Sequence, residues 1–182
     1  MRLSFNIFSI SLLAIFLFGF QTAINPISYK INSSSAKVSF IIKNAGLNVD
    51  GEFSGLSGTI NFDKDNPSAS KIEASIPVKS VDTGINKRDE HLRGEDYFEV
   101  EKYPNIRFVS TKITSKDDVW YNVTGNFTIK ETTKSVTIPF TFSNNVFVGK
   151  FNIDRRDYGV GGNSWIMGDK VKISFEIPVE AL

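Results

Sequence analysis

Apolar and polar residues alternate along most of the chain after residue 25. Successive side chains of a β-strand point to opposite faces, so a period of two predicts strands with one dry and one wet face, as in antiparallel sheets. The clearest run, on one parity, comprises Val119, Tyr121, Val123, Phe127 and Ile129. Comparable runs occupy residues 36–42, 72–78, 136–142, 147–153 and 171–179. The pattern therefore predicts an all-β fold.

Turn-forming residues separate these runs, at 63–70 (DKDNPSAS), 115–118 (SKDD), 130–134 (KETTK) and 143–145 (SNN). The count of runs is about eight strands, several of them long. Long consecutive hairpins favour an up-and-down barrel, but a β-sandwich gives the same alternation. The periodicity by itself leaves both architectures open.

One segment, RDEHLRGEDYFEVEKYPNIRFVS at 88–110, interrupts the alternation. We predict a short helix here, capped by Asp82 or Thr83 and ended by Gly94, because these residue types favour helix termini. If the helix covers one end of a barrel, four apolar side chains face inward: Ile85, Leu92, Tyr97 and Phe98.

The first 23 residues have the layout of a secretory signal peptide. Arg2 precedes an apolar run at about 7–20, which is short for a membrane span, and a polar exit ends at Ala23. We predict cleavage near Ala23, a mature domain at 24–182, and a periplasmic or secreted location. An uncleaved anchor is the alternative, because Gln21 stands where a small residue is preferred.

Charge and cysteine content narrow the function classes. The formal net charge is +1, and loss of Arg2 with the signal peptide reduces it to 0. A neutral chain with interspersed charges lacks the basic stripe of a nucleic-acid-binding protein, so no nucleic-acid partner is expected. The chain has no cysteine, which excludes disulfides and thiol chemistry and suits a periplasmic protein with a large core.

His91 is the only histidine, so every imidazole mechanism would depend on it. No G-x-S-x-G motif accompanies it, and one histidine with Asp89, Glu90 and Glu95 is a poor zinc set. A solvated helix face is the simplest interpretation, with Arg88, His91 and Glu95 supporting one another at spacings of three and four. We therefore expect no catalytic residue, no metal and no cofactor, and keep a ligand-headgroup role for His91 as a hypothesis.

A second irregular segment, DRRDYGVGGNSWIMGDK, occupies residues 154–170. It misses the G-x-G-x-x-G spacing and no βαβ unit follows, which argues against a nucleotide-binding loop. We expect a long loop joining the last two strands, with an Arg155–Asp157 ion pair. Alternatively, Arg155 or Arg156 could contact an anionic headgroup.

Eleven of the sixteen phenylalanines lie outside the predicted signal peptide, mostly on the dry parity of strands. Any one of them is best explained as core packing. A barrel of eight strands, however, has just enough room for one ligand, and an aromatic, uncharged lining suits a long apolar chain. The candidates for such a lining are Phe40, Ile76, Phe108, Val123, Phe127, Phe140 and Phe151.

Three segments follow one another within about residues 27–180: RDEHLRGEDYFEVEKYPNIRFVS, VTGNFTIKETTKSVTIPF and FNIDRRDYGVG. Together, and in this order, they resemble the YceI-like family of polyisoprenoid-binding periplasmic proteins. The series D-x-H-L, D-Y-F and Y-P-x-I-x-F is the most specific part. Its residues are Asp89, His91, Leu92, Asp96, Tyr97, Phe98, Tyr103, Pro104, Ile106 and Phe108.

The resemblance implies an extended, lipocalin-like antiparallel β-barrel with a short helix near one end. It also implies a carrier that holds an isoprenoid or other fatty-chain lipid, with no catalytic residues; His91, Arg88 and Arg155 are headgroup candidates. Transient membrane contact and a homodimer are further expectations. Two alternatives remain: an extracytoplasmic enzyme using His91, and a β-sandwich adhesion or carbohydrate-binding module displaying Trp120 or Trp165.

Overall fold

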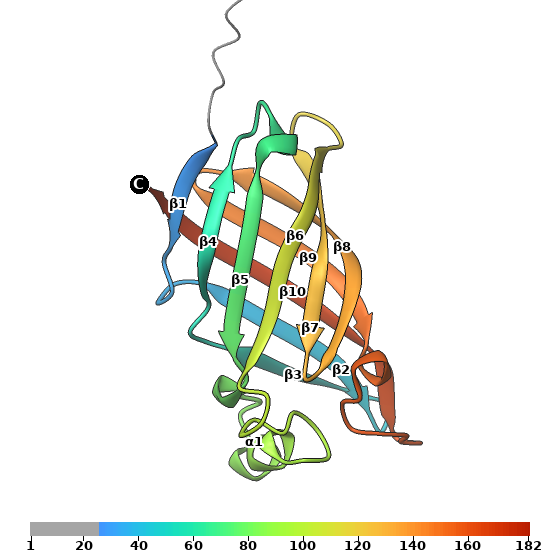
Figure 1. Ribbon diagram of the computed structural model, residues 1–182. Coiled ribbons are helices and arrows are strands. Elements are labelled where there is room, and N and C mark those ends of the chain that lie inside the picture. The colour runs from blue at the N-terminus through green and yellow to red at the C-terminus, as the bar shows by residue number, and fades with distance from the viewer. Residues whose placement is uncertain (1–25) are drawn as a thin grey trace, which may run out of the picture.

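The computed structural model describes residues 26–182, so the predicted signal peptide lies outside the described residues (Figure 1). The strands are β1 (Ile27–Ile31), β2 (Lys37–Asn44), β3 (Leu47–Phe53), β4 (Ser57–Phe62), β5 (Lys71–Pro77), β6 (Asn105–Ser115), β7 (Trp120–Ile129), β8 (Thr132–Ser143), β9 (Val146–Asp154) and β10 (Met167–Ala181). The helices are α1 (Asn86–Arg93) and the 3-10 turns η1 (Pro67–Ala69), η2 (Val78–Ser80) and η3 (Arg155–Tyr158). Among these residues, no helix is long and apolar enough to span a bilayer.

The strands close into an eight-stranded antiparallel barrel, which confirms the predicted fold class. The order is β1-β4-β5-β6-β7-β8-β9-β10, and a further pairing of β1 with β10 completes the circle. Closure joins the two ends of the described chain, since Ile31 pairs with Val179. The sandwich alternative is therefore wrong, because a sandwich has two separate sheets with free edges.

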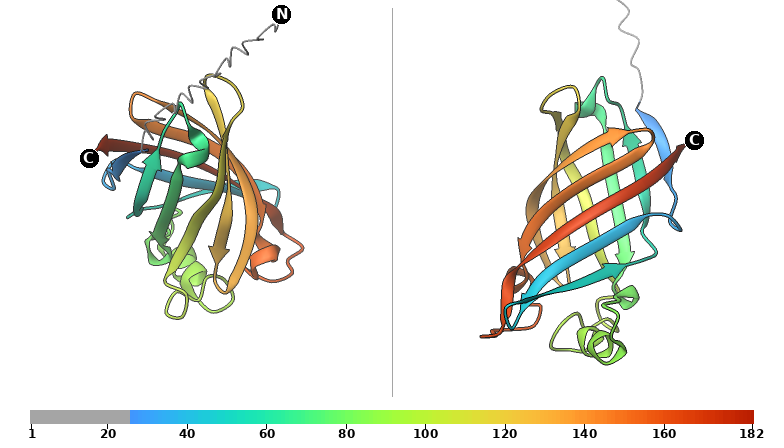
Figure 2. Two further views of the ribbon diagram at one scale, coloured as in Figure 1. Left: turned by 45° about the horizontal axis from the view of Figure 1, so that its top comes forward. Right: turned by 180° about the vertical axis from the view of Figure 1, so that it is seen from behind.

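The strand β10 is the seam of the barrel and pairs with two different strands along the same edge. Its C-terminal part pairs with β1, and its N-terminal part pairs with β2, from Met167 to Glu176. The hairpin β2–β3 therefore continues the wall beside β10, as Figure 2 shows from behind. Beyond β3, one bridge, Glu52 to Asp82, joins this hairpin to the segment after β5.

The interior alternation follows the prediction most closely in β7. Tyr121, Val123, Phe127 and Ile129 are all buried inside the barrel. Val119 is the exception, because it lies in the turn before β7 and is 56% exposed. The wall is regular here, since β7 pairs with β8 along its whole length.

Predicted turns and strand ends agree with the structure to within a few residues. Asn144 and Asn145, in the predicted SNN turn, both have positive φ, which asparagine tolerates better than most residues. The predicted turn at 130–134 is shorter than expected, because β8 already begins at Thr132. Val78, predicted as strand, belongs to η2.

The helix α1 lies across the end of the barrel at which β5 and β7 finish (Figure 1). Gly94 ends the helix, as predicted, but its N-cap is Ile85, so the prediction of Asp82 or Thr83 is wrong. Asp89, which is buried, instead reaches back to the preceding loop. Its Oδ1 accepts hydrogen bonds from the Thr83 amide at 2.9 Å and the Thr83 hydroxyl at 2.5 Å.

Candidate ligand-binding cavity

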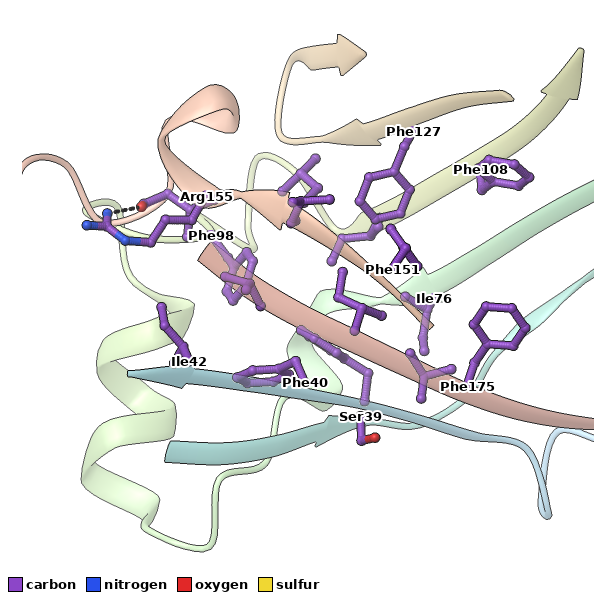
Figure 3. A pocket seen from close by; sticks show the side chains of 18 of the residues that line it. Ser39, Phe40, Ile42, Ile76, Phe98, Phe108, Phe127, Phe151, Arg155 and Phe175 are labelled. Atoms are coloured by element: carbon purple, nitrogen blue, oxygen red, sulfur yellow. Dashed lines mark hydrogen bonds between the residues drawn. The ribbon is translucent and has the colours of Figure 1, made fainter. Parts of the chain in front are cut away.

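A cavity of about 580 Å³ occupies the barrel interior on the side of α1 (Figure 3). This volume lies within the range of small-molecule sites. All seven residues predicted as an apolar lining border it: Phe40, Ile76, Phe108, Val123, Phe127, Phe140 and Phe151. The four apolar residues predicted to face inward from the helical segment, Ile85, Leu92, Tyr97 and Phe98, border it too. That these side chains touch a ligand stays a prediction.

Aromatic packing closes the cavity at the end away from α1. The ring of Phe62 makes edge contacts with Tyr121, Phe140 and Phe147, at centroid distances of 5.1, 5.8 and 5.4 Å. Phe140 and Phe147 border the cavity and are almost completely buried, so they form its floor. Edge-to-face contacts of this kind add to the free energy of burying each ring.

Three inward-facing glycines leave room for phenylalanine rings along the wall. An added Cβ on Gly51 would overlap the ring of Phe40 on the paired strand, and one on Gly149 would overlap the ring of Phe175. Gly125 stands in the same relation to Phe108. Rings that lie against glycines stay close to the wall, which leaves the middle of the barrel unfilled.

These glycine–ring pairs were not predicted from the sequence, although a signal was present. Gly125 and Gly149 stand on the apolar parity of their strands, at positions where a core side chain is the usual choice. A glycine inside a strand often marks a close approach by another group. Which ring covers each glycine depends on strand register, which the sequence pattern does not supply.

Basic side chains gather at the α1 end of the cavity, here called the mouth. Lys87, Arg88 and His91 on α1 border it, and no aspartate or glutamate in the described part of the chain does so. Arg88 Nε donates to Thr83 Oγ1 and its terminal nitrogen to the Thr83 carbonyl, both at 2.7 Å. Lys87 takes part in no ion pair within residues 26–182.

His91 is exposed at the mouth, with its ring 4.9 Å from the ring of Tyr97 in an edge contact. The expected support from Arg88 and Glu95 is not seen: Arg88 bonds to Thr83, and no ion pair of the described chain includes Glu95. Nor do three histidine, aspartate or glutamate side chains within 26–182 gather closely enough to hold a metal ion.

Arg155 is buried beside the mouth and borders the cavity (Figure 3). The predicted ion pair with Asp157 is wrong, because Arg155 pairs with Asp169 at 3.2 Å, whereas Asp157 pairs with Lys134. Its other N–H groups bond to carbonyl oxygens, those of Val160, Gly162, Met167 and Gly168. All five guanidinium N–H groups are thus engaged, and Arg155 holds the 158–168 loop in place.

The turn η3 starts this loop and is fixed electrostatically. Desolvation raises the pKa of the Asp154 carboxyl, but hydrogen bonds from Arg156 outweigh that effect and bring the pKa below its usual value. One of these bonds, from the Arg156 amide at 3.0 Å, caps η3. Behind the loop, burial raises the pKa of the Tyr158 hydroxyl, so this side chain stays neutral at physiological pH.

A closed β-barrel around an apolar cavity defines the general class, that of β-barrel binding proteins. Residues 29–179 match the model of the YceI-like domain, so this chain belongs to the YceI-like family. The resemblance predicted from the sequence motifs is confirmed.

Curated relatives are similar over part of their length. Protein YceI of Salmonella arizonae is 39% identical over 113 residues, covering 60% of this chain and 59% of that protein. A UPF0312 protein of Pectobacterium atrosepticum is 40% identical over 104 residues, covering 57% of this chain and 54% of that protein. The matched region thus spans less than two thirds of these relatives.

Solved structures agree with the fold. Burkholderia cenocepacia BcnA is 31% identical with a TM-score of 0.78, covering 82% of this chain and 99% of that chain. A polyisoprenoid-binding domain from Saccharophagus degradans has a TM-score of 0.66 at 16% identity, covering 86% of this chain and 99% of that chain. The second likeness shows the fold alone.

Proposed function

We propose that this protein is a non-catalytic carrier that holds one long-chain amphiphile, such as a polyisoprenoid lipid, in the barrel. The observation that carries the proposal is the cavity itself, about 580 Å³ with an almost wholly apolar wall. Such a wall favours hydrocarbon and gives little hydrogen bonding to a polar substrate. The related fold of a polyisoprenoid-binding domain supports this ligand class.

The polar head of the ligand would lie at the mouth, against Lys87, Arg88 and His91. Lys87 and Arg88 occupy the first turn of α1, where the helix dipole disfavours positive charge. Lys87 gains no ion pair within the described chain in return. An anionic head, a phosphate or a carboxylate, would compensate both charges. Arg155 was also predicted from the sequence to contact the headgroup, but all its N–H groups already bond within the protein.

The proposed location is extracytoplasmic, after cleavage near Ala23. The support is the signal-like layout of residues 1–23 together with the absence of cysteine. N-terminal sequencing of the protein from its own host tests this. A chain that still begins at Met1 and fractionates with membranes would contradict cleavage and favour the anchor.

Native mass spectrometry of the protein purified gently from its host tests the carrier function. We expect a complex heavier than the chain by the mass of one lipid, and release of that lipid on denaturation in organic solvent. A preparation without bound lipid, which also fails to bind added farnesol or farnesyl phosphate, would overturn the proposal.

Comparison of those two ligands tests the headgroup assignment separately. Lys87→Gln should weaken binding of farnesyl phosphate about fivefold, an effect of roughly 1 kcal/mol, and leave farnesol binding unchanged. Lys79→Gln is the matched control, because Lys79 is exposed nearby but does not border the cavity. Equal binding of both ligands by all three proteins would exclude an anion-selective mouth while leaving the carrier function intact.

The carbohydrate-binding alternative requires aromatic side chains that share one platform. Trp120 and Trp165 are both exposed, but they lie at opposite ends of the barrel, at the start of β7 and after the end of β9 (Figure 1). Two separated rings do not form a sugar-stacking surface, so the geometry favours the lipid carrier.

A further inference from the structure

Three exposed apolar side chains lie on two adjoining segments at one corner of the barrel beside α1. Leu47 is 74% exposed, Ile166 is 65% exposed, and Trp165 is fully exposed. A hydrogen bond of 2.7 Å from the Ala45 amide to the Ile166 carbonyl joins the β2–β3 turn to the 158–168 loop. Leu47, Trp165 and Ile166 therefore form one surface, here named the tip patch.

The two segments that carry the tip patch have no charged side chains, and hydrogen bonds hold the 158–168 loop in place. Residues 44–49 and 158–168 contain no aspartate, glutamate, lysine, arginine or histidine. Ser164 Oγ accepts hydrogen bonds from the Ile166 and Met167 amides at 3.4 and 3.1 Å. Bonds from Arg155 fix the rest of this loop. Trp165 is thus displayed on an ordered turn, although burying it inside would be energetically favourable.

The tip patch continues into the cavity. Its sequence neighbours Asn44, Val49 and Met167 border the cavity, although Leu47 and Ile166 themselves do not. Val49 and Met167 therefore carry apolar surface from the outer corner to the barrel interior, with Asn44 as a polar neighbour at the rim. An apolar surface beside the cavity suits contact with an apolar medium, and a long-chain lipid ligand would come from such a medium.

We propose that the tip patch docks the protein on the interface of a phospholipid bilayer, with the cavity mouth facing the lipid. Tryptophan is enriched at the headgroup level of membranes, and leucine and isoleucine insert just below it. Because neither segment carries a charge, inserting these two segments desolvates no ionic side chain of their own. A long-chain lipid could then pass between bilayer and barrel with little exposure to water.

The size of the tip patch argues against a second protein chain as the occupant. Stable protein interfaces bury about 800 Å² on each partner, which requires some twenty residues rather than three. Shallow insertion into a bilayer needs only a few apolar side chains for reversible binding. Docking rests on the proposed carrier function and adds a step to it. Vesicle binding measures docking, and the lipid content of the purified protein measures the carrier function.

The two tryptophans of the chain allow a direct test, because they report on opposite ends of the barrel. Trp120→Phe leaves Trp165 as the only indole, and Trp165→Phe leaves Trp120. On addition of phosphatidylcholine vesicles, we expect the Trp165 emission to shift to shorter wavelength and become protected from acrylamide. The Trp120 emission should not change, and the response should vary little with salt because the patch is uncharged.

A flotation assay completes the test with variants that retain both indoles. Leu47→Ser with Ile166→Ser should reduce the fraction floating with vesicles at least threefold. Val148→Ser, at an exposed apolar position on the outer wall, should not. Lipid content of the same variants, measured by native mass spectrometry without vesicles, should stay unchanged.

Three results would overturn the docking proposal. In the first, Trp165 stays accessible to acrylamide on vesicles, even in a chain held there by residues 1–23, which contain no tryptophan. In the second, the emission of both tryptophans shifts equally, which would mean unspecific adsorption. A Trp165 shift without vesicles that grows with protein concentration would identify a second copy as the occupant. In each case a retained lipid would show that the carrier function still stands.

Discussion

The two ends of the barrel obey the same alternation of apolar and polar residues but are packed differently. At the end away from α1, here the packed end, Phe62 and Phe140 are each only 1% exposed and form a continuous aromatic cluster. At the end beside α1, the open end, Phe40, Ile42 and Phe53 also face inward but are only partly buried. The alternation therefore determines which way a side chain points, but not how completely the interior is filled.

The difference arises from strand pairing and from glycine. At the packed end, β1 joins β4 and β10 directly, which brings the aromatic rings together from all sides. At the open end, the β2–β3 hairpin has a single bridge to the segment after β5. Phe40 also lies against Gly51 rather than in the barrel centre. The packed end stabilises the fold and the open end is free to hold a ligand.

The largest expected effect is on stability at the packed end. Phe62→Ala should lower the free energy of unfolding by about 3–5 kcal/mol, because it leaves a cavity among rings that cannot relax into it. Phe40→Ala should cost only about 1 kcal/mol, since this side chain is already partly exposed. Urea unfolding of both variants measures the difference. Equal losses would mean that the two ends are equally packed.

A larger side chain should affect ligand binding at the open end and stability at the packed end. Phe127 borders the cavity, and its ring contacts Phe151 and Tyr158 at 5.7 and 5.9 Å. Phe127→Trp should exclude or shorten the bound lipid while thermal unfolding stays cooperative. Phe140→Trp, on the crowded floor, should instead cost about 1–3 kcal/mol by overpacking. If Phe127→Trp merely lowers the melting temperature and no lipid is present in the wild type, the carrier hypothesis loses its support.

A smaller change tests whether glycine keeps the open end hollow. Gly51→Ala should displace the Phe40 ring toward the cavity centre and weaken lipid binding about fivefold, or roughly 1 kcal/mol. Gly168→Ala is the control, because its new methyl group would meet only Lys43, at an ordinary 3.4 Å. Titration of both variants with farnesol compares them. Unchanged affinity in Gly51→Ala would show that the ring position does not limit the cavity.

The smallest expected effect is that of the single histidine. His91→Ala should leave the fold intact and weaken lipid binding by at most about 1 kcal/mol, as for other exposed side chains. Circular dichroism and lipid titration measure both quantities. Elemental analysis provides the check: a stoichiometric metal in the wild type that disappears in His91→Ala would contradict this assignment and revive a metal site.

The local elements of this protein were largely predictable from the sequence. Period-two runs identify β2, β5 and β7 to β10, because side-chain alternation is a property of each strand alone. β6 was not among these runs, since it begins inside the segment that interrupts the alternation. Gly94 also marked the helix end, although its backbone is extended and does not use the left-handed conformation for which glycine is usually preferred there. The short strands β1, β3 and β4 were missed as separate runs; in β3 and β4 a glycine, Gly51 or Gly58, stands at an inward position where the pattern calls for an apolar side chain.

Other features depend on contacts between distant residues, so only the tertiary structure decided them. Barrel rather than sandwich follows from the pairing of Ile31 with Val179, at opposite ends of the described chain. Arg155 pairs with Asp169, not with the nearer Asp157, because the loop folds back over its side chain. The cavity exists because strand register places rings such as Phe40 over glycines. Composition and periodicity fix the face of each residue, whereas register and closure determine what that face meets.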